Sequence, residues 1–123
     1  MEVIIDTNFA ISCVKKGIDF TDQLANMGFK MVVPREVLQE LKDLRISNKI
    51  SHDERIAIDV AFETLSNKKI KKTTIGEGKV DDLLIRKGQE GVYIATLDNG
   101  IKRKIPNKII ILNAKKEVGI ERD

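Results

Sequence analysis

Strand-like and helix-like patterns alternate along the whole chain, and this alternation limits the folds that are open to it. Short apolar runs rich in β-branched residues alternate with amphipathic segments of helical period. Such alternation is typical of βαβ units, so we predict a three-layer α/β/α arrangement around a mainly parallel sheet. The chain has 123 residues, the usual size of one domain, and no linker, repeat or low-complexity tract divides it. One α/β domain over residues 1–123 is therefore expected.

The expected elements follow from apolar periodicity, capping residues and turn residues. Strands are predicted at 2–5, 31–33, 70–73, 92–95 and 108–112. Helices are predicted at 8–16, 19–27, 34–46, 51–66, 79–87 and, as a short helix or turn, 98–104. On the first helix, Ile11, Val14 and Ile18 recur on one face. The polar residues after Leu112 predict a tail that frays.

Composition excludes several classes of protein and of metal site. Hydrophobic residues make up 41% and charged residues 33% of the chain, and its apolar runs are far too short to cross a bilayer, so a soluble cytoplasmic protein without a membrane anchor is expected. The single cysteine, Cys13, cannot form an intrachain disulfide and is expected to be a small core residue. The single histidine, His52, is expected in the first turn of a helix and cannot build the usual zinc site. Any metal must therefore be held by oxygen, as Mg²⁺ or Mn²⁺ is.

Basic residues gather in two blocks, although the net charge of +3 is mild. Such blocks suit phosphate backbones, but charge alone favours two solvated surfaces. Aromatic residues are only 4% of the chain, which argues against binding by base stacking. The blocks are Lys68, Lys69, Lys71 and Lys72, and then Lys102, Arg103, Lys104 and Lys108.

Two acids follow predicted strands directly. Asp6 ends the first strand and Asp98 follows the strand over 92–95. In open parallel sheets the ligand crevice lies outside the carboxyl ends of the strands, where both acids fall. Each acid also has a simpler interpretation as the N-cap of the helix that follows it, which is favoured for either residue taken alone.

Two further acids lie where apolar residues are expected. Glu40 is at the edge of its helix's apolar stripe. Asp81 shares a helix face with Leu84, Ile85 and Gly88, whereas Asp82 falls on the solvent side. A salt bridge to Asp81 and a charged helix edge at Glu40 are the simpler interpretations. If Asp6, Glu40, Asp81 and Asp98 converge, however, their repulsion requires a divalent cation, and the four become candidate catalytic ligands of a phosphodiester hydrolase.

Polar residues beside these acids are candidate contacts to the substrate phosphate. They can also orient the carboxylates, and turn-forming or capping roles are equally consistent with their positions. They are Thr7, Asn8, Thr96 and Asn99, joined by Lys102 and Arg103 of the second basic block.

The order of these motifs resembles the PIN domain family, with its Rossmann-like fold, over nearly the whole chain. The resemblance rests on four segments, Val3–Asn8, Val33–Leu41, Val80–Ile85 and Ile94–Asp98. It implies Asp6, Glu40, Asp81 and Asp98 as ligands of Mg²⁺ or Mn²⁺, with Asp82 as the alternative to Asp81. It further implies an endoribonuclease that cleaves single-stranded or structured RNA, and a homodimer is a common form in the family.

Within that family, the paired Asp81-Asp82 and the segment Gly100–Ile105 after Asp98 look more like the rRNA-processing branch, which implies ribosome-assembly partners. A toxin ribonuclease with an antitoxin partner is the alternative, and a non-catalytic RNA-binding module is another. A phospho-accepting receiver domain is disfavoured because the strand over 31–33 ends without an acceptor aspartate.

Overall fold

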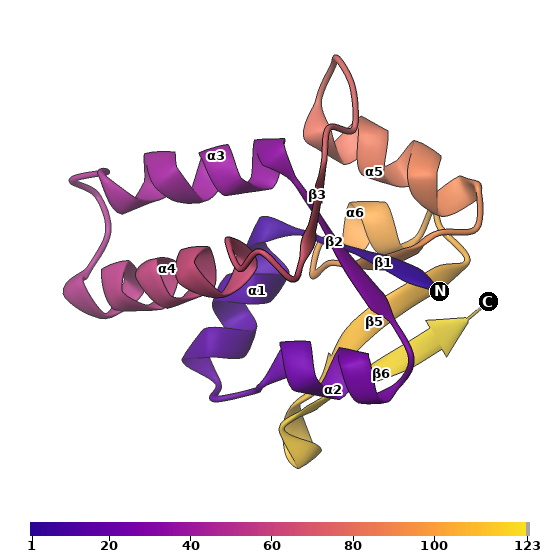
Figure 1. Cartoon of the computed structure of the whole chain (residues 1–123), viewed down its shortest axis with the longest axis horizontal. Helices are drawn as coiled ribbons and strands as arrows, with labels where there is room; N and C mark the ends of the chain where they lie inside the picture. The colour runs from indigo at the N-terminus through magenta and orange to yellow at the C-terminus, as the bar shows by residue number, and fades with distance from the viewer. Residues whose placement is uncertain (123) are drawn as a thin grey trace.

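A six-stranded sheet runs through the computed structural model, which describes residues 1–122 (Figure 1). Its strands lie side by side in the order β3-β2-β1-β4-β5-β6. The first five are parallel to one another and β6 is antiparallel to β5, so the sheet is mainly parallel, as predicted. The strands are β1 (Glu2–Ile5), β2 (Lys30–Pro34), β3 (Lys71–Thr73), β4 (Tyr93–Ala95), β5 (Asn107–Leu112) and β6 (Glu117–Arg122).

The helices fill the intervals that the sequence pattern assigns to them, within a few residues at each end. Several begin at a side-chain cap: Asp19 accepts from the amide of Asp22 and Ser51 accepts from the amide of Glu54. The helices are α1 (Thr7–Lys15), α2 (Phe20–Asn26), α3 (Arg35–Arg45), α4 (His52–Leu65), α5 (Val80–Gln89), α6 (Asn99–Lys102) and the 3₁₀ turn η1 (Asn113–Lys115).

The two faces of the sheet are covered by different sets of helices. Successive residues of β1 point to opposite faces, so Val3 and Ile5 join one buried cluster while Ile4 joins the other. The first cluster takes the apolar residues of α1, α2, α3 and α4, and the second takes those of α5 and α6. The result is the predicted three-layer α/β/α arrangement.

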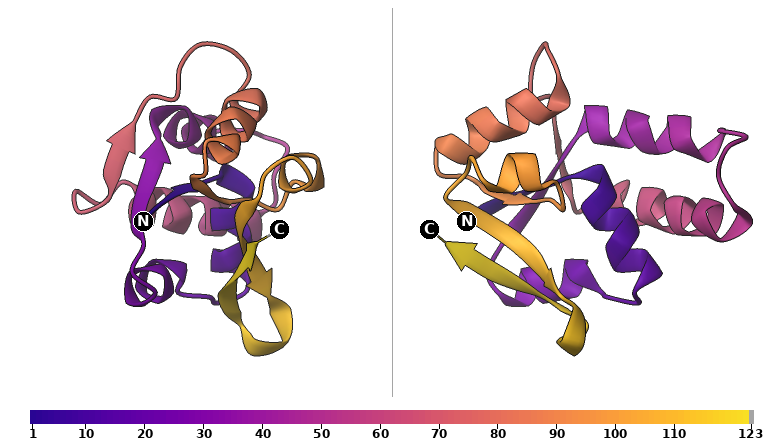
Figure 2. Two further views of the ribbon diagram at one scale, coloured as in Figure 1. Left: turned by 90° about the vertical axis from the view of Figure 1, so that its right-hand side faces the viewer. Right: turned by 180° about the vertical axis from the view of Figure 1, so that it is seen from behind.

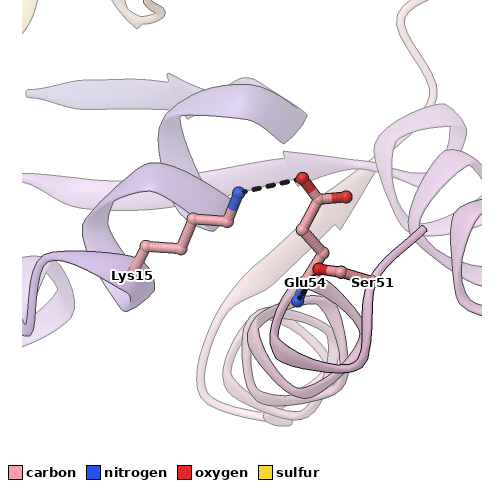
Figure 3. A network of polar contacts seen from close by, with 3 residues as sticks. All are labelled: Lys15, Ser51 and Glu54. Atoms are coloured by element: carbon pink, nitrogen blue, oxygen red, sulfur yellow. Dashed lines mark hydrogen bonds and ion pairs between the residues drawn. The ribbon is translucent and has the colours of Figure 1, made fainter.

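Helix α4 packs against α1, and α3 and α4 lie side by side as an antiparallel pair (Figure 1). Lys15 at the end of α1 forms an ion pair of 3.5 Å with Glu54 in the first turn of α4, beside the Ser51 cap (Figure 3). Both side chains are about half exposed, so the pair contributes little to stability. Apolar packing therefore fixes the place of α1, and with it the end of β1.

Two predictions about local structure are wrong, those for the tail and for Lys108. The segment after Leu112 does not fray, because β6 pairs with β5 along its full length in the hairpin that Figure 2 shows at one edge of the sheet. Helix α1 buries Phe9, Ala10 and Cys13, and Ile11 and Val14 pack against the same cluster while partly buried. Lys108 is not part of a solvated basic surface, since it is 3% exposed and its Nζ donates to the Ile105 carbonyl.

The predictions for Cys13 and His52 are confirmed. Cys13 lies fully buried in the core, and this burial raises the pKa of its thiol to about 12. His52 is the exposed first residue of α4. Within residues 1–122, every helix is too short or too polar to traverse a lipid bilayer.

Candidate functional site

Asp6 and Asp98, the acids predicted to follow strands, lie at the carboxyl edge of the sheet, where the order of the strands reverses. From β1 the chain adds β2 and β3 on one side, and later adds β4 and β5 on the other. Ile5 of β1 pairs with Ala95 of β4, and the Asp6 amide donates to the Ala95 carbonyl at 3.0 Å. Asp6 and Thr96, the next residue of each strand, are therefore neighbours at the carboxyl edge of the sheet. Open parallel sheets bind their ligands at this topological switch point.

Asp6 is a buried carboxylate with two hydrogen bonds. It is 8% exposed, its Oδ1 accepts from the Thr7 amide at 2.8 Å, and its Oδ2 accepts from the Thr96 hydroxyl at 2.8 Å. Burial raises the pKa of Asp6 above its ordinary value, and the two hydrogen bonds oppose that rise. The negative charges of Glu40 and Asp81 raise the pKa further, so these three acids share one electrostatic environment.

Glu40 reaches the site from α3 and is tied to the start of α1. The Thr7 hydroxyl donates to Glu40 Oε2 at 3.0 Å. Thr7 is itself 1% exposed, whereas Glu40 is exposed. Thr7 and Thr96 therefore orient the carboxylates, which was one of the roles the sequence left open for them.

The first turn of α5 presents Asp81 and Asp82, both exposed. Leu84 and Gly88 are buried, as the helix phase predicted for the face that Asp81 shares. Asp81 is among the charges that act on Asp6, and Asp82 is not. Asp81 is therefore part of the electrostatic environment of Asp6.

Asp98 is joined to this group through its backbone, and one oxygen of its carboxylate is used to cap α6. Its amide donates to the Thr96 hydroxyl oxygen at 3.1 Å. Its Oδ1 accepts from the amides of Gly100 at 2.7 Å and Ile101 at 3.2 Å, so it caps α6. The capping interpretation is confirmed for Asp98, and it also holds for Asp6, whose Oδ1 caps α1.

The remaining predicted contacts lie at the surface of the same region. Asn8 and Asn99 are exposed, Lys102 is partly buried and Arg103 is exposed. Arg103 Nε donates to the Asn99 carbonyl at 3.2 Å, which holds its guanidinium over α6.

The donor set suits a hard divalent cation. All of the candidate donors are carboxylate oxygens, which Mg²⁺ and Mn²⁺ prefer. None of the four ion pairs formed among residues 1–122 involves these acids, so no lysine or arginine neutralises the buried carboxylate of Asp6. In this conformation, however, no three histidine, cysteine, aspartate or glutamate side chains in the described part of the chain lie close enough together to enclose an ion.

The sequence pattern did not single out Glu36. It lies one helical turn before Glu40 on α3, and its Oε1 is buried without a hydrogen-bond partner among residues 1–122. The spacing of four residues, which places both acids on one side of the helix, was the available signal.

The fold and the strand-end acids define the class of protein. Residues 3–115 match the family described as a PIN like domain, and the chain belongs to that family. Ribonuclease VapC4 of Methanocaldococcus jannaschii is 28% identical over 107 residues, an alignment that covers 85% of this chain and 82% of that protein.

A solved structure shows the same fold. The PIN domain endonuclease Utp24 aligns with 99% of this chain and 92% of its own, with a TM-score of 0.78 and 21% sequence identity. At this identity the likeness concerns the fold, and it agrees with the α/β architecture that the alternating pattern predicted.

Proposed function

We propose that residues 1–123 form one nuclease domain, a metal-dependent endoribonuclease that hydrolyses RNA phosphodiester bonds. The observation that carries the proposal is the buried carboxylate of Asp6 at the topological switch point. The negative charges of two further acids, Glu40 and Asp81, act on it, and it forms no ion pair with a lysine or arginine among residues 1–122. Burying a carboxylate without a counter-charge costs free energy, so a native protein retains one where a ligand offsets that cost. The similarity to a protein named as a ribonuclease supports RNA as the substrate.

Asp6, Glu40 and Asp81 are the proposed ligands of Mg²⁺ or Mn²⁺, with Asp82 as the alternative to Asp81. Glu40 and Asp81 are exposed side chains whose charges act on Asp6, which supports a shared cation. Asp98 is the fourth proposed ligand, through the oxygen that does not cap α6. When bound, the cation makes water more acidic and offsets the charge that develops on the phosphate.

The neighbouring residues have separate tasks in this proposal. Thr96 fixes Oδ2 of Asp6 and Thr7 fixes Oε2 of Glu40, so two of the carboxylates are oriented before the substrate arrives. Two basic residues are proposed to bind substrate phosphates: Lys102, the last residue of α6, and Arg103, which follows it. The ammonium of Lys102 would act as a point charge, and the guanidinium of Arg103 would donate two hydrogen bonds to one phosphate. Asn8 and Asn99 are proposed as further donors to phosphate oxygens.

For the cellular role we propose RNA processing, in particular of ribosomal RNA, with ribosome-assembly proteins as partners. The support is the residue pattern of paired Asp81-Asp82 and the basic segment that follows Asp98. A toxin ribonuclease is the alternative, favoured by the similarity to VapC4. Growth arrest on expression of the active protein, relieved by a protein encoded beside it, would select the toxin role.

The test is cleavage of a labelled single-stranded RNA during a titration with Mg²⁺ or Mn²⁺. We expect cleavage that requires the metal and that falls about a hundredfold or more in Asp6→Asn. Asp53→Asn, which changes an exposed acid in the first turn of α4, is the matched control and should cleave as the unmodified protein does. Cleavage by folded Asp6→Asn at the unmodified rate would refute the proposal, and metal-independent RNA binding without cleavage would select the non-catalytic module.

A further inference from the structure

Helix α3 carries charges of opposite sign on its two sides. Glu40, which accepts from the Thr7 hydroxyl, lies on the side turned to the candidate site, and Glu36 lies one turn before it. Each residue of an α-helix is rotated by about 100° from the one before it, so Arg35 and Lys42 lie about 140° and 160° away from Glu40. Both are exposed. The helix therefore has an acidic side at the candidate site and a basic side away from it.

Lys72 of β3 extends the basic side of α3 onto the sheet. Pro34, the N-cap of α3, pairs with Thr73 of β3, so the helix begins beside that strand (Figure 1). The preceding pair is Val33 with Lys72. Paired residues of neighbouring strands point to the same face, and Val33 belongs to the buried cluster that α3 covers. Lys72 therefore lies on the face of the sheet that carries α3.

The three cations have no counter-charge. None of Arg35, Lys42 and Lys72 forms an ion pair with any residue in 1–122. The Lys72 ammonium donates to the carbonyls of Asn67 at 2.7 Å and Ile70 at 2.6 Å, which hold it in place. Burial lowers the pKa of Lys72, and the positive charge of Arg35 lowers it further, so these two cations repel each other. A bound anion would offset that repulsion.

Lys42 is held in place by an aromatic ring of α4. Its Nζ lies 5.8 Å from the ring centroid of Phe62, and Cζ of Arg45 lies 4.9 Å from the same centroid. Arg45 also pairs with Asp59 at 3.6 Å, so its charge is already shared. The half-buried ring attracts both cations and is not free as a platform for bases. This face therefore presents fixed charges and not a stacking surface.

The spacing of the cations suits a chain of phosphates. Arg35 and Lys42 are seven residues apart, which is about 10 Å along the helix axis, and Lys72 lies beyond Arg35 on β3. We call Lys72, Arg35 and Lys42 the basic strip of α3. Arg35 directly follows the carboxyl end of β2, which neighbours β1, so the strip begins beside the strand end that carries Asp6. A row of separate cations neutralises successive phosphates of a nucleic-acid strand.

We propose that the basic strip of α3 binds the phosphate backbone of the substrate RNA beyond the bond that is cleaved. The identity of the strand as RNA rests on the proposed function. The strand passes Asp6, then Arg35 at the start of α3, and continues toward Lys42. Contacts to phosphates hold the strand in register without selecting its sequence. An acidic protein segment fits less well, because Leu38 and Phe62 are only partly exposed and offer it little apolar surface to bury.

The test measures the affinity for a fluorescent oligouridine of about 20 nucleotides in EDTA, where no cleavage interferes. The test variant combines Arg35→Glu with Lys42→Glu. The control combines Lys115→Glu with Lys116→Glu, two exposed lysines between β5 and β6, and it changes the net charge by the same amount.

The test variant should bind the oligouridine about tenfold more weakly or worse, and the slope of log affinity against log salt should fall by about 1.4 for two lost phosphate contacts. The control should lose less than about twofold at about 0.15 M salt, where charges more than about 8 Å away are screened.

Cleavage with Mn²⁺ provides a second measurement. The ratio of kcat/KM for the oligouridine of about 20 nucleotides to kcat/KM for one of about four should exceed one in the unmodified protein, because only the longer RNA reaches the strip. This preference for the longer RNA should fall about tenfold in the test variant and persist in the control.

Three results would overturn the inference. The first is equal affinity of the test variant and the control, and the second is the absence of oligouridine binding by the unmodified protein at low salt. The third is a set of amide shifts in the basic strip that an acidic peptide produces and oligouridine does not, which would assign this face to a protein. Because affinity is measured in EDTA, it decides this inference whether or not the protein cleaves RNA, and cleavage alone decides the proposed function.

Discussion

Removing the hydroxyl of Thr96 tests how strongly the site is organised around Asp6. Thr96 is 0% exposed, and its Oγ1 donates to Asp6 Oδ2 while it accepts from the Asp98 amide. Thr96→Val keeps the shape of the side chain and deletes both interactions. Asp6 then loses one of its two hydrogen bonds, and the Asp98 amide loses its acceptor.

The expected loss of stability follows from these two contacts. A hydrogen bond to a charged group contributes about 1.5–3 kcal/mol, and a neutral one about 1 kcal/mol. The free energy of unfolding should therefore fall by about 2–4 kcal/mol, a large part of the roughly 5–15 kcal/mol of a typical domain. With a urea m-value of about 2 kcal/mol/M, the middle of the usual range, the midpoint should move down by roughly 1–2 M.

Urea unfolding followed by circular dichroism measures this change, and Thr96→Ser is the control because it restores the hydroxyl. Thr96→Ser should recover most of the lost stability and most of the RNA cleavage. A Thr96→Val midpoint within about 0.3 M of the unmodified protein would refute the reasoning, because it would mean that the two contacts add nothing net.

The same variant should show a pH dependence of known sign. The pKa of Asp6 is raised above 3.8 in the folded protein, so between 3.8 and the raised value the folded state binds more protons than the unfolded chain. Ionisation of Asp6 therefore lowers stability as the pH rises through this window. Because the Thr96 bond lowers that pKa, Thr96→Val raises it further, and its penalty should be larger at about pH 7 than at about pH 4.

Three further predictions concern the helices that carry the site and the core. Asp81→Asn should reduce RNA cleavage by about tenfold or more, whereas Asp82→Asn should change it little; the reverse order, measured on the same labelled RNA, would reassign the ligand. Gly88→Ala should lower the free energy of unfolding by about 1–3 kcal/mol, because its Cβ would lie 2.3 Å from Cγ2 of Ile105, and an unchanged urea midpoint would contradict this. Cys13, with a thiol pKa of about 12 and no exposed surface, should react with iodoacetamide near pH 8 only after denaturation, and fast labelling of the folded protein would show that the core opens there.

Much of the fold follows from local pattern alone. Strands such as β1 and β2 are short apolar runs, and caps such as Ser51 mark where a helix begins, so the amino-acid pattern is enough to place five strands and six helices. The strand β6 could not be placed in this way, because Glu117–Arg122 has little apolar content and is ordered by pairing with β5.

The candidate site could be predicted as a set of residues but not as a geometry. The positions of Asp6 and Asp98 after strands follow from the pattern. The predicted inward position of Asp81 is wrong, because Asp81 is exposed, as Asp82 is. Sequence does not give strand order, so the placing of β1 beside β4 at the switch point came from the structure. The sequence also does not give side-chain rotamers. The rotamers decide that Asp6 Oδ2 accepts a hydrogen bond from Thr96 and that the Asp98 carboxylate caps α6.

The central claim is that Asp6 binds a divalent cation, and Mn²⁺ binding to the RNA-free protein tests it most directly. Calorimetric titration of the unmodified protein should show saturable binding that raises its unfolding midpoint. Asp6→Asn keeps the acceptor for the Thr7 amide, and it should lose this binding while being at least as stable as the unmodified protein in EDTA. Equal Mn²⁺ affinity in the two proteins, or no binding by the unmodified one, would contradict the account.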